Sequence, residues 1–175
     1  MEACPLKQKK TLVLLAQSGV IAALYVALTT LLQPIGFGSV QCRIAEALTV
    51  LPVYLPAAIP GLTVGCFLSN LIGLAPAANP AGALDLLLGT GATALAAALT
   101  YALRNVRLGN LPVAATIPPV LVNAVVVGAE LYVVYGGLPL AAHMALVGIG
   151  QAVACIGGGL IVAAAVQKSG ITARW

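Results

Sequence analysis

Charge is what this sequence lacks most. Aspartate, glutamate, lysine and arginine together make up 7% of its 175 residues, whereas hydrophobic residues make up 61%. A soluble domain carries about 25% charged residues, so this chain cannot cover itself with a surface that water tolerates. One helical crossing of a hydrocarbon core needs roughly 20 apolar residues, so the length allows at most about six or seven crossings. The sequence therefore predicts an all-α integral membrane protein with little chain outside the bilayer.

The motifs of catalysis and ATP hydrolysis are also missing. The sequence has no GxxxxGK[ST] phosphate-binding loop and no HExxH or GxSxG spacing. Its cysteines show no CxxC or Cys/His spacing and lie in or beside apolar runs, so we interpret them as small core residues. We expect no catalytic residues, no metal site, no cofactor and no nucleic-acid partner, and an energy source outside this chain. The cysteines are Cys4, Cys42, Cys66 and Cys155.

Six apolar segments, separated by glycine, proline or polar residues, define the expected helices. The first, residues 11–32, is longer than the roughly 7 to 15 residues of a signal-peptide core, so we interpret it as a retained helix. The second and third are short because Pro56 and Pro60, which have no amide hydrogen, disfavour continuation. The remaining segments follow an irregular stretch (33–43), a Pro/Asn loop (75–81) and two turns (104–110 and 136–139). The second to sixth segments are residues 44–55, 61–74, 82–103, 111–135 and 140–166.

The basic residues outside the second segment fix the expected topology. They form three groups, and cytoplasmic loops are enriched in lysine and arginine, so all three groups should lie on the inner side. Six crossings satisfy this condition, and a re-entrant hairpin at 44–74 would satisfy it too. We predict a basic cytoplasmic tail (1–10), one six-helix membrane domain (11–167) and a cytoplasmic C-terminal tail (168–175). The groups are Lys7, Lys9 and Lys10; Arg104 and Arg107; and Lys168 and Arg174.

The other ionisable residues, apart from Glu2, fall near the outer ends of the expected helices. Ionisable side chains in membrane segments cost a few kcal/mol and usually face a cavity or a partner. Their convergence predicts a substrate-binding site that faces the outside. The candidate substrate-binding residues are Arg43, Glu46, Asn70, Asp85, Asn123, Glu130, His143 and Gln151.

Several of these candidates have a structural alternative. Arg43 and Glu46 are three residues apart on a helix and could simply pair with each other. Asp85 lies near a helix start, where a carboxylate can cap the free amides. His143 shares roughly one side of its helix with Gln151, and a lone interfacial histidine is often structural.

Glu130 has the strongest claim to a site role. No lysine or arginine on its own segment can neutralise it, and Asn123, one heptad earlier, lies on the same helix face. Below Asp85, one face of the fourth segment carries small residues such as Gly89 and Ala92. Such a face could leave room for a flat ligand or could serve close helix packing.

The balance of charges near the outer ends suggests the class of ligand. Three carboxylates, those of Glu46, Asp85 and Glu130, stand against the single guanidinium of Arg43. The site should therefore favour a ligand that is cationic or rich in N–H groups. A carboxylate accepts two parallel N–H bonds, which the amidine-like edge of a purine or deazapurine would supply.

Three stretches of the sequence resemble the QueT family of queuosine-precursor transporters. The stretches are VQCRIAEALTVLPVYLPAAIPGLTVGCFLSNLIG at 40–73, GALDLLLGTGATALAAALTYALR at 82–104 and PPVLVNAVVVGAELY at 118–132. The resemblance implies a six-helix S component of an energy-coupling-factor (ECF) transporter in the bacterial plasma membrane. Such a subunit would capture a 7-deazaguanine, such as queuine or preQ1, from outside the cell.

The resemblance also implies partner subunits. S components associate with a membrane coupling subunit and two cytoplasmic ATPases, and commonly dock through small residues on the first helix. In this sequence Gly19, Ala23 and Ala27 form such a small-xxx-small face. Internal helix packing is the alternative interpretation of these three residues.

Other functions are kept as alternatives. The chain could be a stand-alone secondary carrier for a small cationic or purine-like molecule, or an S component for another vitamin. Co-purification with ATPase subunits would separate a carrier from an S component. An intramembrane enzyme using Asp85, Glu130 and His143 would change its ligand chemically. A water channel is disfavoured, because such channels carry two Asn-Pro-Ala triplets and this sequence has one, at 79–81.

Overall fold

The computed structural model describes residues 5–33, 41–75, 79 and 81–170, with side chains from residue 8 onward. Every regular element in this part of the chain is a helix, which confirms the predicted all-α class. Parts of the predicted tails lie outside the described residues, as do Cys4, the side chain of Lys7, Arg174, and most of the predicted 33–43 and 75–81 loops.

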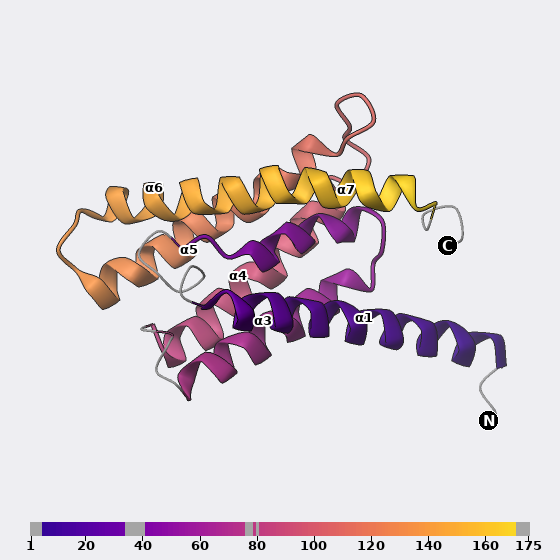
Figure 1. Cartoon of the computed structure of the whole chain (residues 1–175), viewed down its shortest axis with the longest axis horizontal. Coiled ribbons are helices and arrows are strands. Elements are labelled where there is room, and N and C mark those ends of the chain that lie inside the picture. Colours follow the sequence, from indigo (N-terminus) through magenta and orange to yellow (C-terminus); the bar gives the residue numbers. More distant parts are fainter. Residues whose placement is uncertain (1–4, 34–40, 76–78, 80, 171–175) are drawn as a thin grey trace.

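The described chain forms six helical segments (Figure 1). Four of them are long and apolar enough to span a membrane, and two are shorter. The last segment is continuous, because α6 passes through a π-helical stretch, η3, into α7. The elements are α1 (Pro5–Leu31), the 3-10 helix η1 (Ile44–Val53), α3 (Ala58–Leu74), α4 (Ala83–Ala102), the 3-10 turn η2 (Val113–Thr116), α5 (Ile117–Tyr135), α6 (Leu140–Gln151), η3 (Ala152–Gly158) and α7 (Gly159–Lys168).

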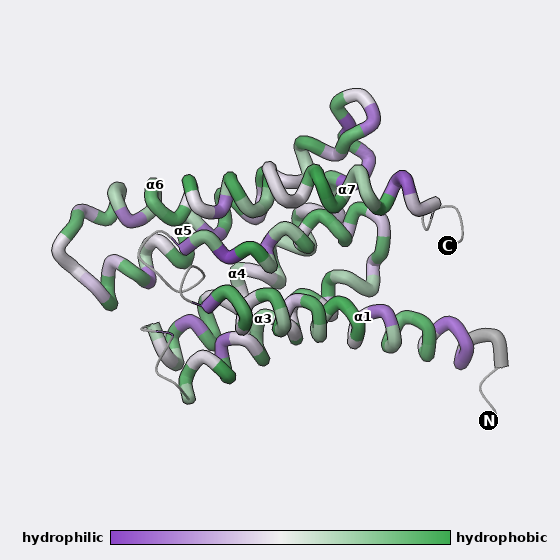
Figure 2. Tube along the Cα trace, viewed as in Figure 1, coloured by the Kyte–Doolittle hydropathy of each residue, from purple (hydrophilic) through white to green (hydrophobic). Residues whose placement is uncertain are grey.

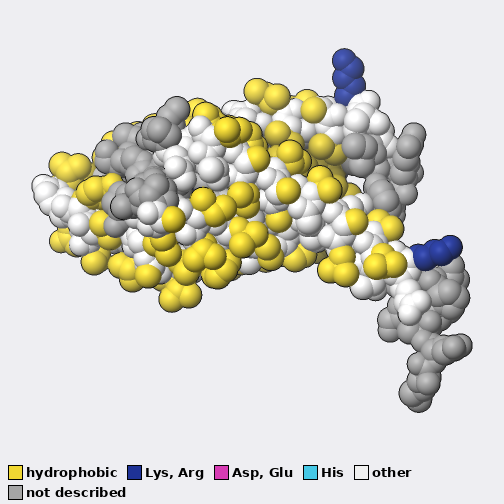
Figure 3. All heavy atoms as spheres, turned by 60° about the horizontal axis from the view of Figure 1, so that its bottom comes forward, with side chains coloured by type: hydrophobic (Ala, Val, Ile, Leu, Met, Phe, Trp, Pro, Cys, Tyr) yellow, Lys and Arg dark blue, Asp and Glu magenta, His cyan; other side chains and the backbone are white. Residues whose placement is uncertain are grey.

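The surface of the bundle is apolar along the helices and basic at one end. Hydrophobic residues dominate the helices in Figure 2, and hydrophobic side chains cover much of the face in Figure 3. In that view, Lys and Arg side chains stand only at the end where α1 begins. The 103–112 segment and the end of α7 lie at this same end (Figure 1). This surface is that of a multi-pass membrane protein.

Three helices begin elsewhere than the sequence predicts. Helix α3 begins at Ala58 and not at residue 61, because Pro60 falls in its first turn, where a missing amide costs no helical bond. Helix α1 already begins at Pro5, so part of the predicted N-terminal tail is helical. Proline suits the first position of a helix, and the Lys and Gln residues that follow are good helix formers. The segment predicted as one helix over 111–135 is divided, because α5 starts at Ile117 after η2. Pro118 and Pro119 then occupy the first turn of α5, where their missing amides cost no helical bond.

The short second helix, η1, is the centre of the bundle. It packs against α1, α3, α4, α7, η2 and η3, and every residue from Ala45 to Val53 is buried. As a 3-10 helix it has about 3.0 residues per turn, so residues three apart eclipse each other. Glu46 and Thr49 therefore stand in one row, with Arg43 at the N-cap position before them. This geometry, which the sequence did not reveal, aims a line of polar side chains into an apolar bundle.

Candidate functional site

A buried ion pair joins the start of η1 to the start of α4. Arg43 Nη2 lies 3.0 Å from Asp85 Oδ2, and the side chains are 5% and 0% exposed. Asn79 Nδ2 donates to the same carboxylate oxygen at 2.8 Å. The other oxygen, Asp85 Oδ1, has no hydrogen-bond partner among the described residues. One oxygen of the Asp85 carboxylate is therefore bound by Arg43 and Asn79, and the other can accept a hydrogen bond from a ligand.

Glu46 repeats this arrangement one turn further along η1. Its Oε1 accepts a hydrogen bond from the Tyr25 hydroxyl of α1, and Thr93 Oγ1 of α4 donates to it at 3.4 Å. Its Oε2 is buried and, within the described chain, has no partner. Side chains of α1 and α4 thus orient the Glu46 carboxylate so that Oε1 is hydrogen-bonded and Oε2 can accept a hydrogen bond from a ligand.

Residues of α3 close the space between these two carboxylates. Asn70 Nδ2 donates to the backbone oxygen of Asp85 at 2.8 Å, while Asn70 Oδ1 is buried without a described partner. Cys66 Sγ lies 3.5 Å from Arg43 Nη1 and 3.3 Å from Thr93 Oγ1, whose single hydroxyl hydrogen is shared between Cys66 and Glu46. Cys66, which the sequence suggested as a core residue, therefore also contacts the buried polar residues Arg43 and Thr93.

Glu130 faces the same region from α5. Its side chain is 3% exposed, and neither carboxylate oxygen has a hydrogen-bond partner in the described structure. The charges of Asp85 and Arg43 act electrostatically on this carboxyl group. No other candidate residue combines a buried carboxylate with two unpartnered oxygens in this part of the chain.

We call the buried, unpartnered oxygens of these residues the acceptor cluster. Leaving such a group without a partner costs about 1–3 kcal/mol, and native proteins contain few of them. Five acceptor atoms from four helices are therefore open to hydrogen-bond donors from outside the chain, which makes these residues the candidate binding site. Their chemistry fits a ligand with several N–H donors and a positive charge. The cluster consists of Glu46 Oε2, Asn70 Oδ1, Asp85 Oδ1 and both carboxylate oxygens of Glu130.

Three predicted site residues form no hydrogen bond or ion pair with the acceptor cluster within the described part of the chain. His143 Nε2 lies 3.2 Å from the carbonyl oxygen of Gly136, and its ring meets Tyr132 edge-on at 6.2 Å between centroids. These contacts fix the turn between α5 and α6. Gln151 Oε1 accepts a hydrogen bond from Cys155 Sγ at 3.3 Å, four residues further along the same helical segment. Asn123 is buried on α5 at 3% exposure.

Arg43 and Asp85 make a long-range contact in addition to the local roles weighed for them. Arg43 forms an ion pair with Asp85, 42 positions along the chain. Asp85 does lie in the first turn of α4, but no side-chain bond caps that helix and the Asp85 carboxylate points to Arg43 and Asn79. Spacing along one helix could not identify this pair.

Four residues that contact Arg43, Glu46 or Asp85 were not predicted as site residues by the sequence analysis. Tyr25 stands out only as a single tyrosine in the apolar first helix, and Asn79 belongs to the Asn-Pro-Ala triplet, which was compared only with water channels, and that interpretation was disfavoured. Thr93 and Cys66 carry no sequence signal, because small polar residues are common in membrane helices. Tertiary contacts with Glu46, Asp85 and Arg43 are what identify all four.

Gly89 allows the Asp85 carboxylate its position. A Cβ atom at residue 89 would lie 1.8 Å from Asp85 Oδ1, so the Gly89→Ala substitution must displace that side chain. We expect the variant to bind its ligand at least tenfold more weakly, about 1.4 kcal/mol, in a calorimetric titration. Gly91→Ala is the matched control, because a Cβ there meets nothing within 4 Å. Equal affinity of both variants and the wild type would refute this role for Gly89.

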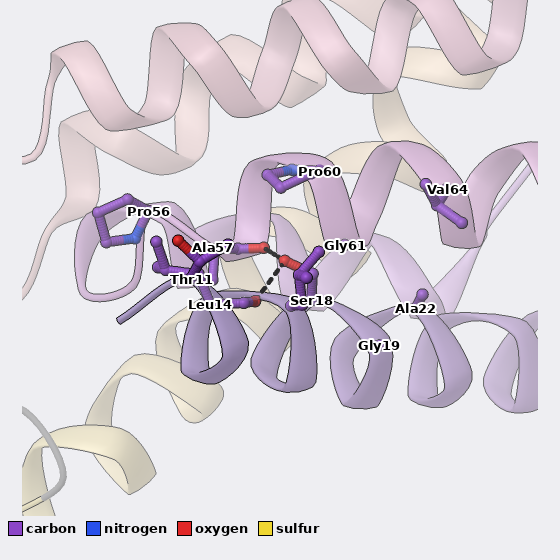
Figure 4. A pocket seen from close by; sticks show the side chains of 11 residues that line it. Thr11, Leu14, Ser18, Gly19, Ala22, Pro56, Ala57, Pro60, Gly61 and Val64 are labelled. Carbon is purple, nitrogen blue, oxygen red and sulfur yellow. Dashed lines mark hydrogen bonds between the residues drawn. The ribbon is translucent and has the colours of Figure 1, made fainter. Parts of the chain in front are cut away.

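A groove runs along the outside of the bundle between α1 and α3. One stretch, of about 410 Å³, lies beside Ser18, Ala57 and Pro60 (Figure 4). The adjoining stretch is lined by the three predicted interface residues, Gly19, Ala23 and Ala27, all of which are exposed. The packing of α1 within the chain uses its other face.

A comparison with protein families gives one match to this chain. A family model described as QueT transporter matches residues 15–168, which include the four candidate spans almost completely and all residues of the acceptor cluster. No curated protein and no solved structure matches.

Proposed function

Because the chain belongs to the QueT transporter family, we propose that it is the S component of an ECF importer and captures a queuosine precursor. The chain is a transport protein with no phosphate-binding loop of its own, so ATP hydrolysis would fall to partner subunits. The expected ligand is a 7-deazaguanine such as queuine or preQ1.

The acceptor cluster is the observation that carries the ligand assignment. A 7-deazaguanine has a guanidine-like edge with parallel N–H donors, and some precursors add a protonated amine. Glu130 keeps both oxygens available and suits the two parallel donors of that edge. Asp85 Oδ1 and Asn70 Oδ1 are single acceptors, which suits an ammonium group with three donors. Glu46 Oε2 accepts one further N–H.

Charge at the two ends of the bundle supports an orientation. The basic end would be cytoplasmic under the positive-inside rule. Helix α4, with Asp85 in its first turn, begins at the opposite end in Figure 1. The ligand would then enter from outside a bacterial plasma membrane, with all six helical segments contributing to the membrane domain. The exposed groove with Gly19, Ala23 and Ala27 would receive the coupling subunit.

Reconstituted uptake tests this proposal. Liposomes carrying this chain with a coupling subunit and two ATPases should accumulate labelled queuine or preQ1 only when ATP is supplied on the ATPase side. The same liposomes without the ATPases are the control. Uptake by the chain alone would show a secondary carrier, and chemical conversion of the label would show an enzyme. Either result would overturn the S-component assignment.

A further inference from the structure

Tyr25 brings the first helix into the ligand site. Its side chain is 0% exposed, and its hydroxyl donates to Oε1 of Glu46. Because that oxygen is held by Tyr25 and Thr93, the other oxygen, Oε2, is the one presented to a ligand. The orientation of an acceptor in the site therefore depends on a residue from α1.

The position of Tyr25 depends in turn on how closely α1 lies against α3. A Cβ on Gly65 of α3 would lie 2.8 Å from Cβ of Tyr25 and 3.1 Å from Cα of Ala22. Helices α1 and α3 can approach each other this closely only because residue 65 is glycine. Nearer the basic end, Ser18 Oγ donates to the carbonyl of Ala57 at 2.8 Å and keeps the two helices together (Figure 4).

The outward side of α1 is the groove with Gly19, Ala23 and Ala27, all exposed. One helix thus has its inward face in the ligand site and its outward face free of the bundle. Any partner that shifts α1 against α3 would also move the Tyr25 hydroxyl relative to Glu46. A rigid α1 with no polar contact to the site would have no such effect.

We propose that Tyr25 is a positioning residue of the ligand site, and that the α1–α3 contact at Gly65 controls how well it holds Glu46. This inference rests on the proposed function for its ligand, but not for the contact itself. It makes α1 an element whose position against α3 affects ligand affinity. The physical link is one hydrogen bond to a carboxylate, which is among the stronger kinds in proteins.

Ligand titration of three variants tests the proposal. Tyr25→Phe removes the hydroxyl and keeps the ring, and we expect it to weaken queuine or preQ1 binding about tenfold or more. Gly65→Ala should weaken binding similarly by pushing Tyr25 away. The double variant should bind no more weakly than Tyr25→Phe alone, because the bond can be lost only once. Gly91→Ala on α4 is the control and should bind like the wild type, since a Cβ there meets nothing within 4 Å.

Merely structural roles would produce a different pattern. If Tyr25 and Gly65 only supported packing, each substitution would lower the melting temperature, and the folded protein would still bind with normal affinity. Any decreases in affinity would then be independent and would add in the double variant. Wild-type affinity of folded Tyr25→Phe, or additive losses in the double variant, would overturn the proposal.

A ligand-free measurement separates this proposal from the transport assignment. The infrared carboxyl band of Glu46 can be identified as the band lost in Glu46→Gln. Tyr25→Phe and Gly65→Ala should both shift that band, and Gly91→Ala should not. An unshifted band would overturn the role of Tyr25 even if no deazaguanine binds. A shifted band without deazaguanine binding would instead contradict only the ligand assignment.

Discussion

Replacing Arg43 with methionine is expected to lower the free energy of unfolding by about 3–5 kcal/mol. Arg43 and Asp85 are buried together, with 3.0 Å between Nη2 and Oδ2. Methionine keeps much of the apolar volume but removes the charge, which leaves the Asp85 carboxylate buried without its counter-ion. The cost of an uncompensated buried charge exceeds any gain from the added apolar surface. Unfolding in detergent micelles by added dodecyl sulfate would measure the loss.

Two further variants make the Arg43 experiment specific. The double variant Arg43→Met/Asp85→Leu removes both charges and should recover much of the lost stability, because a buried pair can often be replaced by apolar residues. Arg107→Met removes an exposed arginine at the basic end and should leave stability within about 0.5 kcal/mol of the wild type. Wild-type stability of the single Arg43→Met variant would show that the ion pair does not hold the site.

Glu130→Gln is expected to weaken ligand binding without lowering the stability of the fold. The two Glu130 oxygens have no hydrogen-bond partner among the described residues, so the carboxylate contributes little to folding. Removing its charge should leave the free energy of unfolding unchanged or slightly higher, since burying a charge is costly. Ligand affinity should fall at least tenfold, about 1.4 kcal/mol, because the amide carries no charge and places an N–H donor where one of the two carboxylate oxygens accepted. Calorimetry and unfolding of the same preparation would give both numbers.

The control for Glu130 is again at the other end of the molecule. Arg107→Gln neutralises an exposed charge and should change neither affinity nor stability. A Glu130→Gln variant that unfolds as easily as Arg43→Met would contradict a ligand-binding role and indicate a structural one. The two expected outcomes together distinguish a residue that stabilises the site, Arg43, from a residue that binds the ligand, Glu130.

The sequence predicted most of the membrane fold correctly. Long apolar runs separated by glycine and proline located the four long helices and the two short ones to within several residues. The errors have local causes. Hydropathy does not detect the start of α1 at Pro5, because lysine and glutamine favour helices without being apolar. Hydropathy also cannot distinguish a 3-10 helix from an α-helix, so the form of η1 was missed.

The candidate site was only partly predictable from the sequence. The rarity of charge in membrane helices was enough to select Arg43, Glu46, Asp85 and Glu130, all of which the structure buries. It was not enough to pair Arg43 with Asp85, since helical periodicity assigns a face but not a partner on another helix. Tyr25 was missed for the same reason, because its role exists only through its contact with Glu46.

Calorimetric titration of the purified, detergent-solubilised chain tests the central claim most directly. The ligands would be queuine, preQ1, guanine and riboflavin, each titrated into the wild type and Glu130→Gln. We predict tight binding of a 7-deazaguanine to the wild type, at least tenfold weaker binding to the variant, and no binding of riboflavin. If folded wild-type protein bound none of the deazaguanines, the queuosine-precursor assignment and the role of the acceptor cluster in it would be contradicted.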